Sequence, residues 1–157
     1  FKSVRRVYSN ATLNIIGPKN LEIPSEYSAG VFYHGFLSRS NSYQKQKFEK
    51  IMNESTVFVM PSLYEPFGIA PLEAMVYEIP CILTNAWAFP EMVKPSVNGE
   101  LVKCDDVNEL TEKIIYLLQN PNQLQVMGKA GRDLVLRKFT WQNVVNNLIS
   151  ELSLSKC

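Results

Sequence analysis

The chain has 157 residues, of which 46% are hydrophobic and 20% are charged, and its formal net charge is +1. This length suits one domain with a single core and is short for two, and the apolar content excludes an intrinsically disordered chain. No apolar stretch approaches the roughly 18 to 20 residues that span a bilayer, no segment near Phe1 has the pattern of a signal peptide, and there is no uniformly basic face for nucleic acid.

Short apolar runs alternate with helical patterns along the chain. Strands are predicted at residues 12–17, 31–33, 56–60, 81–84 and 99–102, where apolar and β-branched side chains cluster before Gly or Pro or after Pro. Apolar side chains at helical spacing predict helices at 43–52, 69–77, 122–139 and 141 to about 152, and one more that Asp105 or Asp106 caps. The alternation predicts a single doubly wound α/β domain over residues 1–157, with a parallel sheet and helices on both faces.

Three cysteines are present: Cys81, Cys104 and Cys157. The odd count, the absence of a CxxC pair and the single histidine, His34, argue against a disulfide framework or a zinc site. Cys81 lies in an apolar run and is expected to pack as a small buried side chain. Reduced thiols are typical of a cytoplasmic protein.

The segment after the third predicted strand is the most informative about function. In folds of this class, ligands bind beyond the carboxyl ends of the strands. Glu65 follows the strand, Gly68 allows close backbone approach, and the helix from Ile69 offers free N–H groups and a positive dipole end to a phosphate. Glu73 lies one turn into that helix, roughly 6 Å along its axis.

Two carboxylates around an anion-binding helix end suit a nucleoside diphosphate sugar, which carries hydroxyl groups on both sides of its diphosphate. The alternative is that the helix dipole favours an acidic residue in the first turn whether or not a ligand binds there. Both interpretations remain open on the spacing alone.

The ordered set of motifs resembles the donor-binding domain of GT-B glycosyltransferases of the group 1, family four type. Glu65-Pro-Phe-Gly68 lies within a Glu-x7-Glu pattern that ends at Glu73, after Pro61-Ser62. Further matches follow in order along nearly the whole chain: the strand at 79–85, Pro90-Glu91, Asn98-Gly-Glu-Leu-Val102 and Phe139-Thr-Trp141.

This resemblance implies a Rossmann-like half of a GT-B fold and an enzyme that transfers a sugar with retention of configuration, without a cofactor and without a metal held by Asp-x-Asp, a motif that the chain lacks. Glu65 would act at the donor sugar as the catalytic residue, backbone N–H groups near Gly68 would bind the diphosphate, and Glu73 would accept hydrogen bonds from the ribose. The full set of substrate-binding residues that the resemblance implies is Gly35, Phe36, Leu37, Glu65, Phe67, Gly68, Ile69 and Glu73, the first three lining the base pocket.

The chain also departs from the family pattern. The basic pair that neutralises the diphosphate would lie upstream of Phe1, so we expect a domain truncated on its N-terminal side, with the acceptor domain absent and little turnover by this piece alone. Ala88-Phe89, next to Trp87, stand where a Gly-Gly pair is frequent in the family. We expect a nucleoside diphosphate sugar and the missing N-terminal domain as partners, and a cytoplasmic parent protein, free or at the inner membrane surface. A GT-B epimerase and a non-catalytic nucleotide-binding or interaction module are the alternatives, while the donor base, the sugar and the acceptor stay undetermined.

Overall fold

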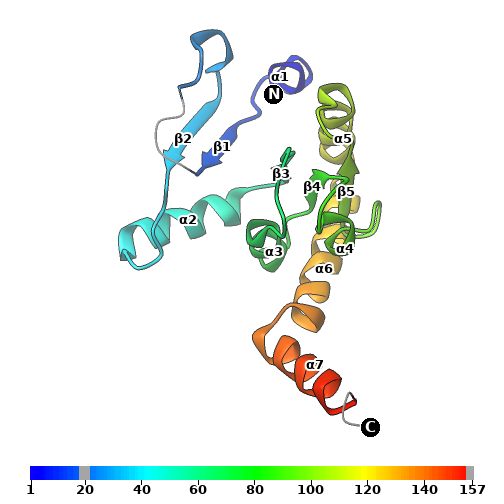
Figure 1. Cartoon of the computed structure of the whole chain (residues 1–157). Coiled ribbons are helices and arrows are strands. Elements are labelled where there is room, and N and C mark those ends of the chain that lie inside the picture. Colours follow the sequence, from blue (N-terminus) through cyan, green and yellow to red (C-terminus); the bar gives the residue numbers. More distant parts are fainter. Residues whose placement is uncertain (18–21, 155–157) are drawn as a thin grey trace.

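The structure is a computed structural model that describes residues 1–17 and 22–154. Cys157 lies outside this part of the chain. In chain order the elements are α1 (Lys2–Val7), β1 (Leu13–Ile16), a 3-10 turn (Ser25–Tyr27), β2 (Val31–Gly35), α2 (Ser42–Glu54), β3 (Phe58–Met60), α3 (Ile69–Val76), β4 (Cys81–Thr84), α4 (Phe89–Met92), β5 (Gly99–Val102), α5 (Val107–Gln119), α6 (Pro121–Lys138) and α7 (Trp141–Leu154) (Figure 1).

The predicted strands and helices are present, with ends shifted by a few residues. Asp106 rather than Asp105 caps α5, because its side chain accepts a hydrogen bond from the Glu109 amide at 2.8 Å. The third strand begins two residues later than expected, at Phe58, whose amide donates to the Pro80 carbonyl. The α/β class with parallel strands is therefore confirmed.

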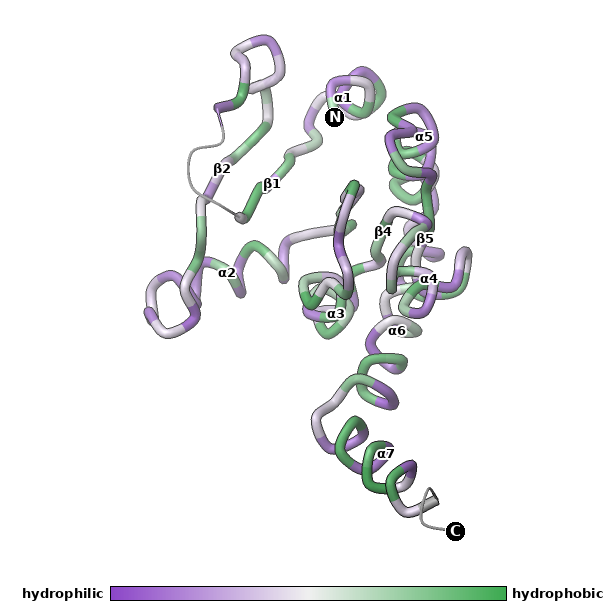
Figure 2. The backbone as a smooth tube through the Cα atoms, in the orientation of Figure 1, coloured by the Kyte–Doolittle hydropathy of each residue, from purple (hydrophilic) through white to green (hydrophobic). Residues whose placement is uncertain are grey.

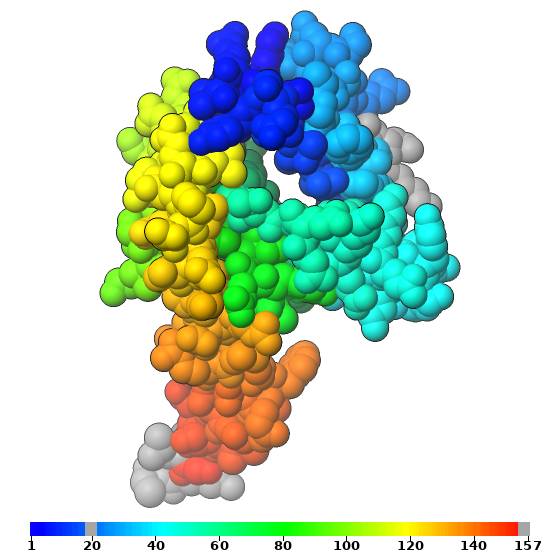
Figure 3. All heavy atoms as spheres, turned by 180° about the vertical axis from the view of Figure 1, so that it is seen from behind, coloured from blue at the N-terminus to red at the C-terminus, as the bar shows by residue number. Residues whose placement is uncertain are grey.

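The strands form two parallel sheets, whereas one sheet was predicted. β1 pairs with β2, and β4 pairs with both β3 and β5. In Figure 1 the strands follow one another in the order β2, β1, β3, β4, β5, but β1 and β3 are not hydrogen-bonded neighbours. The space-filling view from behind shows an opening between the blue N-terminal segment, which contains α1, β1 and β2, and the rest of the chain (Figure 3).

The main core lies around the three-stranded sheet. All four residues of β4 are buried, and Met75, Leu83 and Phe89 are completely buried in one core cluster that includes residues of α3, α4 and α6. Gly128 of α6 faces the Glu78 carbonyl so closely that a Cβ atom would collide with it. The absence of a side chain there lets α6 lie directly on the turn between α3 and β4.

The last helix, α7, extends away from the core after Phe139 (Figures 1 and 2). Its apolar side chains are exposed; Trp141 is 85% exposed. Among residues 1–17 and 22–154, no helix is long and apolar enough to cross a membrane.

Candidate functional site

The loop after β3 is attached to the end of the neighbouring strand. Thr84, the last residue of β4, is buried and its hydroxyl donates to the Ser62 carbonyl at 2.9 Å. This bond holds the start of the segment that contains Glu65 against the carboxyl edge of the sheet. The sequence predicts a ligand site at this edge, and the fold places the two carboxylates of the Glu-x7-Glu pattern around it.

Gly68 determines how the chain enters α3. Its φ of 80° lies in the left-handed region that favours glycine. A Cβ atom there would lie 2.7 Å from Cε1 of Phe89 and 3.3 Å from Cγ of Glu65. The missing side chain therefore brings the buried Phe89 ring and the Glu65 side chain up to the helix terminus.

The N-terminus of α3 has free backbone donors. No side chain caps it, and Pro71, in its first turn, has no N–H group. The amides of Gly68, Ile69 and Ala70 precede the first intrahelical hydrogen bond, so they point out of the helix with the positive end of its dipole. An anion is the kind of ligand that this terminus accommodates.

The two carboxylates of the site differ in their surroundings. Glu65 is half-buried and, within the described part of the chain, its carboxylate forms no hydrogen bond or ion pair. Glu73 is paired: Oε2 lies 2.5 Å from Nη2 of Arg39. The first carboxylate is therefore open to a ligand, and the second is already attached to the loop that follows β2.

The other predicted residues lie in two groups. Ile69 is 65% exposed at the start of α3, and Phe67 is half exposed with its ring edge-on to Phe139 at 6.4 Å. Gly35 ends β2 with a φ of 65°, and Phe36 after it is largely exposed, whereas Leu37 is buried. The Leu37 side chain thus packs in the interior, and only the backbone of that residue remains for a ligand.

An exposed aromatic pair stands beside the site. The Tyr64 and Trp87 rings meet edge-to-face at 4.9 Å, and both are exposed. They come from the loops after β3 and β4, which end at the same edge. The Trp87 ring, next to the Ala88-Phe89 departure from the family pattern, therefore contacts the segment that contains Glu65.

His34, the single histidine of the chain, is near the end of β2 and contacts Oδ1 of Asn14 at 2.8 Å. Burial first, and the charge of Lys47 second, lower the pKa of its imidazole below 6.5. An imidazole bonded to a side chain of the neighbouring strand β1 is a structural arrangement.

Arg39 is the site residue that the sequence analysis missed. It belongs to the loop after β2, and with Lys45, Phe48, Glu49 and Glu73 it lines a pocket of about 280 Å³ between α2 and α3. Nothing in the local pattern marks Arg39, since its partner is in a different element of the fold.

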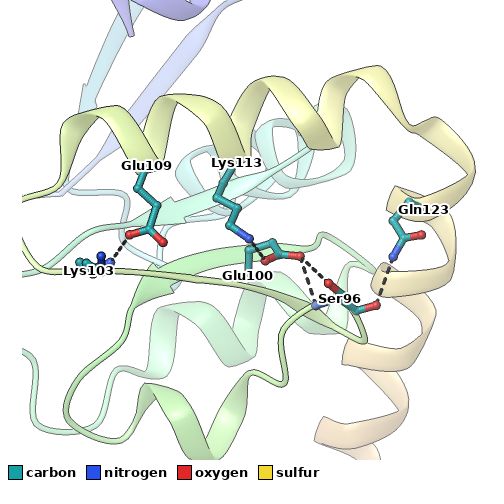
Figure 4. A network of polar contacts seen from close by, with 6 residues as sticks. All are labelled: Ser96, Glu100, Lys103, Glu109, Lys113 and Gln123. Atoms are coloured by element: carbon teal, nitrogen blue, oxygen red, sulfur yellow. Dashed lines mark hydrogen bonds and ion pairs between the residues drawn. The ribbon is translucent and has the colours of Figure 1, made fainter.

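A second polar cluster, on β5, is structural. The Glu100 side chain is buried and accepts from the Lys113 ammonium at 2.6 Å and from the amide and hydroxyl of Ser96 at 3.1 and 3.2 Å (Figure 4). Gln123 of α6 donates to the Ser96 carbonyl. Because groups of the chain itself surround this carboxylate, it joins β5 to α5 and leaves no room for a ligand.

A family model and a curated relative each match most of the chain. The family model described as "Glycosyl transferases group 1" matches residues 1–134. A curated relative, the MMP alpha-(1->4)-mannosyltransferase of Mycolicibacterium hassiacum, is 33% identical over 114 residues, which are 71% of this chain and 27% of the relative. The chain thus spans about a quarter of that relative's length.

Solved structures share the fold. Sucrose-phosphate synthase from Thermosynechococcus elongatus superposes with a TM-score of 0.75 at 23% identity, over 99% of this chain and 43% of that one. Anabaena Alr3699/HepE in complex with UDP and glucose gives a TM-score of 0.75 at 18% identity, over 96% of this chain and 43% of that one.

Proposed function

The chain belongs to the group 1 glycosyl transferases, and from that premise we propose that it binds the nucleoside diphosphate sugar donor of a retaining glycosyltransferase. The observation that carries the proposal is the edge of the three-stranded sheet. There Glu65, whose carboxylate has no partner among the described residues, lies beside an uncapped helix terminus, and a second carboxylate, Glu73, lies one turn further on.

Each part of the site has a partner on such a donor. The free amides of Gly68, Ile69 and Ala70 suit the diphosphate, because they direct N–H groups and the helix dipole at negative charge. Glu73 accepts from ribose hydroxyls, and Glu65, across the helix terminus, accepts from hydroxyls of the sugar. A structural neighbour, Anabaena Alr3699/HepE, is described in complex with UDP and glucose, which supports this class of ligand.

The departing diphosphate gains negative charge during sugar transfer. Fixed donors aimed at developing charge are an effective form of catalysis, so we assign the α3 terminus to stabilise the leaving group and Glu65 to hold the sugar against it. Transfer itself requires an acceptor, and we propose that a second domain of the parent protein binds it.

The same proposal extends to the sheet. In the doubly wound order 3-2-1-4-5-6 the first strand is central; the order β2, β1, β3, β4, β5 in Figure 1 is that order without its first strand. β1 and β3 are only partly buried although their residues are almost all apolar, as in strands covered on both sides. We propose that a further parallel strand occupies the opening between them.

The experiment compares two ligands in two variants. Glu65→Ala is expected to weaken binding of the nucleoside diphosphate sugar by about 10- to 100-fold, from one lost charge-assisted contact, and to leave the bare diphosphate almost unchanged. Glu112→Ala, which removes an exposed carboxylate of α5, is the control and should change neither affinity. Ligand-observed NMR with uridine, guanosine and adenosine compounds detects weak binding.

If Glu65→Ala weakens the bare diphosphate as much as the sugar nucleotide, the assignment of Glu65 to the sugar is wrong. If none of these ligands binds the wild-type chain at millimolar concentration, the proposal for this domain is wrong.

A further inference from the structure

Glu73 is held by a residue from another part of the fold. Nη2 of Arg39 lies 2.5 Å from Oε2 of Glu73, so the loop after β2 and the first turns of α3 are joined at this point. The carboxylate side chain is 30% exposed and the arginine side chain is 50% exposed. The pair therefore lies at the rim of the site, open to a ligand from the solvent side.

The arginine is itself restrained. Its guanidinium carbon lies 4.4 Å from the centre of the Phe48 ring of α2, an arrangement in which the planar group stacks on an aromatic face. Phe48 packs against the main core and meets Tyr77 edge-on at 6.4 Å. The Arg39 guanidinium is thus held between the Phe48 ring and the Glu73 carboxylate.

The ion pair leaves most of the accepting capacity of Glu73 unused. An ionised carboxylate has about four lone-pair sites on two oxygens, and Arg39 contacts Oε2 alone. Oε1 forms no hydrogen bond within the part of the chain that the structure describes. Two vicinal hydroxyl groups need an acceptor with a fixed orientation, which a freely rotating glutamate does not provide.

We propose that Arg39 is a positioning residue that orients the Glu73 carboxylate toward the two ribose hydroxyls of the donor. This inference rests on the proposed function. It gives Arg39 no contact with the ligand: the residue acts through Glu73, and its removal lowers the ability of the site to recognise the hydroxyl pair.

The test measures recognition of the hydroxyls rather than affinity alone. The first ligand is the uridine, guanosine or adenosine diphosphate that the wild-type chain binds most tightly, and the second is the 2′,3′-dideoxy form of the same nucleotide. A dissociation constant is determined for each. The dissociation constant of the dideoxy form divided by that of the ribose form reports the contact between Glu73 and the ribose hydroxyls. Arg39→Met keeps an apolar stem over Phe48 and removes the guanidinium, and it should reduce this ratio by about two- to fivefold, the range of an exposed ion pair.

A matched control separates positioning from charge. Lys45 lines the same pocket and pairs with Glu49 at 3.8 Å rather than with Glu73. Lys45→Met removes the same charge from the same pocket, so it should weaken both ligands by equal factors and leave the ratio unchanged. Arg39→Lys keeps the charge without the planar guanidinium, so its ratio should lie between the ratios of Arg39→Met and the wild-type chain. In a Glu73→Gln background, Arg39→Met should have no further effect on the ratio.

Two results would overturn the inference: an unchanged ratio in Arg39→Met, as expected for the Lys45 control, or a full effect of Arg39→Met in the Glu73→Gln background. Tight binding by the wild-type chain with a ratio near one would instead contradict the role of Glu73 in the proposed function. No binding by the wild-type chain would overturn both proposals.

Discussion

Three glycines of this chain test how its backbone geometry controls stability. Gly68 has a φ of 80° and no room for a Cβ atom. Gly35 has a φ of 65°, and Gly17 has no such φ; a Cβ atom at either position would have nothing within 4 Å among the residues that the structure describes. Replacing each with alanine therefore separates backbone strain from steric conflict, and Gly17→Ala serves as the control.

The expected magnitudes follow from these differences. A left-handed conformation costs a residue with a Cβ atom about 1–2 kcal/mol, and this cost applies to Gly35→Ala. At Gly68 an overpacking cost of about 1–3 kcal/mol is added, because the new methyl group would lie 2.7 Å from Phe89. The sum is about 2–5 kcal/mol. Gly17→Ala should be neutral or stabilise by up to about 1 kcal/mol, since it reduces the entropy of the unfolded chain.

Urea denaturation followed by circular dichroism measures these changes. With a slope of about 2 kcal/mol per molar urea, Gly68→Ala should lower the midpoint by about 1–2.5 M. Phe89→Leu should partly relieve the conflict, so that the double variant is more stable than the sum of the single effects predicts. Equal midpoints for Gly68→Ala and Gly35→Ala would refute the steric part of the reasoning, and an unchanged midpoint in both would refute the backbone part.

Three further predictions concern residues outside the candidate site. Gly128→Ala should destabilise the chain by about 1–3 kcal/mol, although alanine favours helices, because its methyl group would collide with the Glu78 carbonyl. Lys129→Ala, on the exposed face of α6, is the control, and equal urea midpoints for the two variants would contradict the packing. The imidazole of His34 should titrate below 6.5 by NMR, since burial lowers its pKa. Because the unfolded chain then binds more protons, the contribution of His34 to stability is complete above pH 6.5 and is lost as pH falls through the folded pKa. An NMR titration midpoint above 6.5 would contradict this prediction. Burial raises the pKa of the Cys81 thiol, so iodoacetamide at pH 8 should modify the exposed Cys104 in the native chain and Cys81 only in urea; early labelling of Cys81 would argue against a closed core.

Local features of the sequence were sufficient for the elements and for part of the site. β4 and β5 have the predicted bounds, and the Thr140 hydroxyl accepts from the Asn143 amide at the start of α7 as an N-cap does. Glu65, Gly68 and the start of α3 were predicted because each depends on a turn or a helix terminus within a few residues.

The parallel pairing of the strands was predicted, but their division into two sheets was not, for a physical reason. Alternating strands and helices predict parallel pairing, but they do not say which strands become neighbours, because the pairing joins segments far apart in the chain. β1 and β3 each have the apolar composition of an inner strand, and the structure nevertheless leaves each at an edge.

The sequence by itself determined the α/β class, the positions of the strands and helices and the places of Glu65 and Glu73 around the start of α3, because these follow from periodicity, capping and composition over short distances. Only the tertiary structure decided that Glu73 is bound by Arg39 while Glu65 has no partner among residues 1–17 and 22–154, that Leu37 faces the interior, and that the strands divide into two sheets. Each of these depends on which distant segments meet, and the chain establishes such contacts only when it packs around β4.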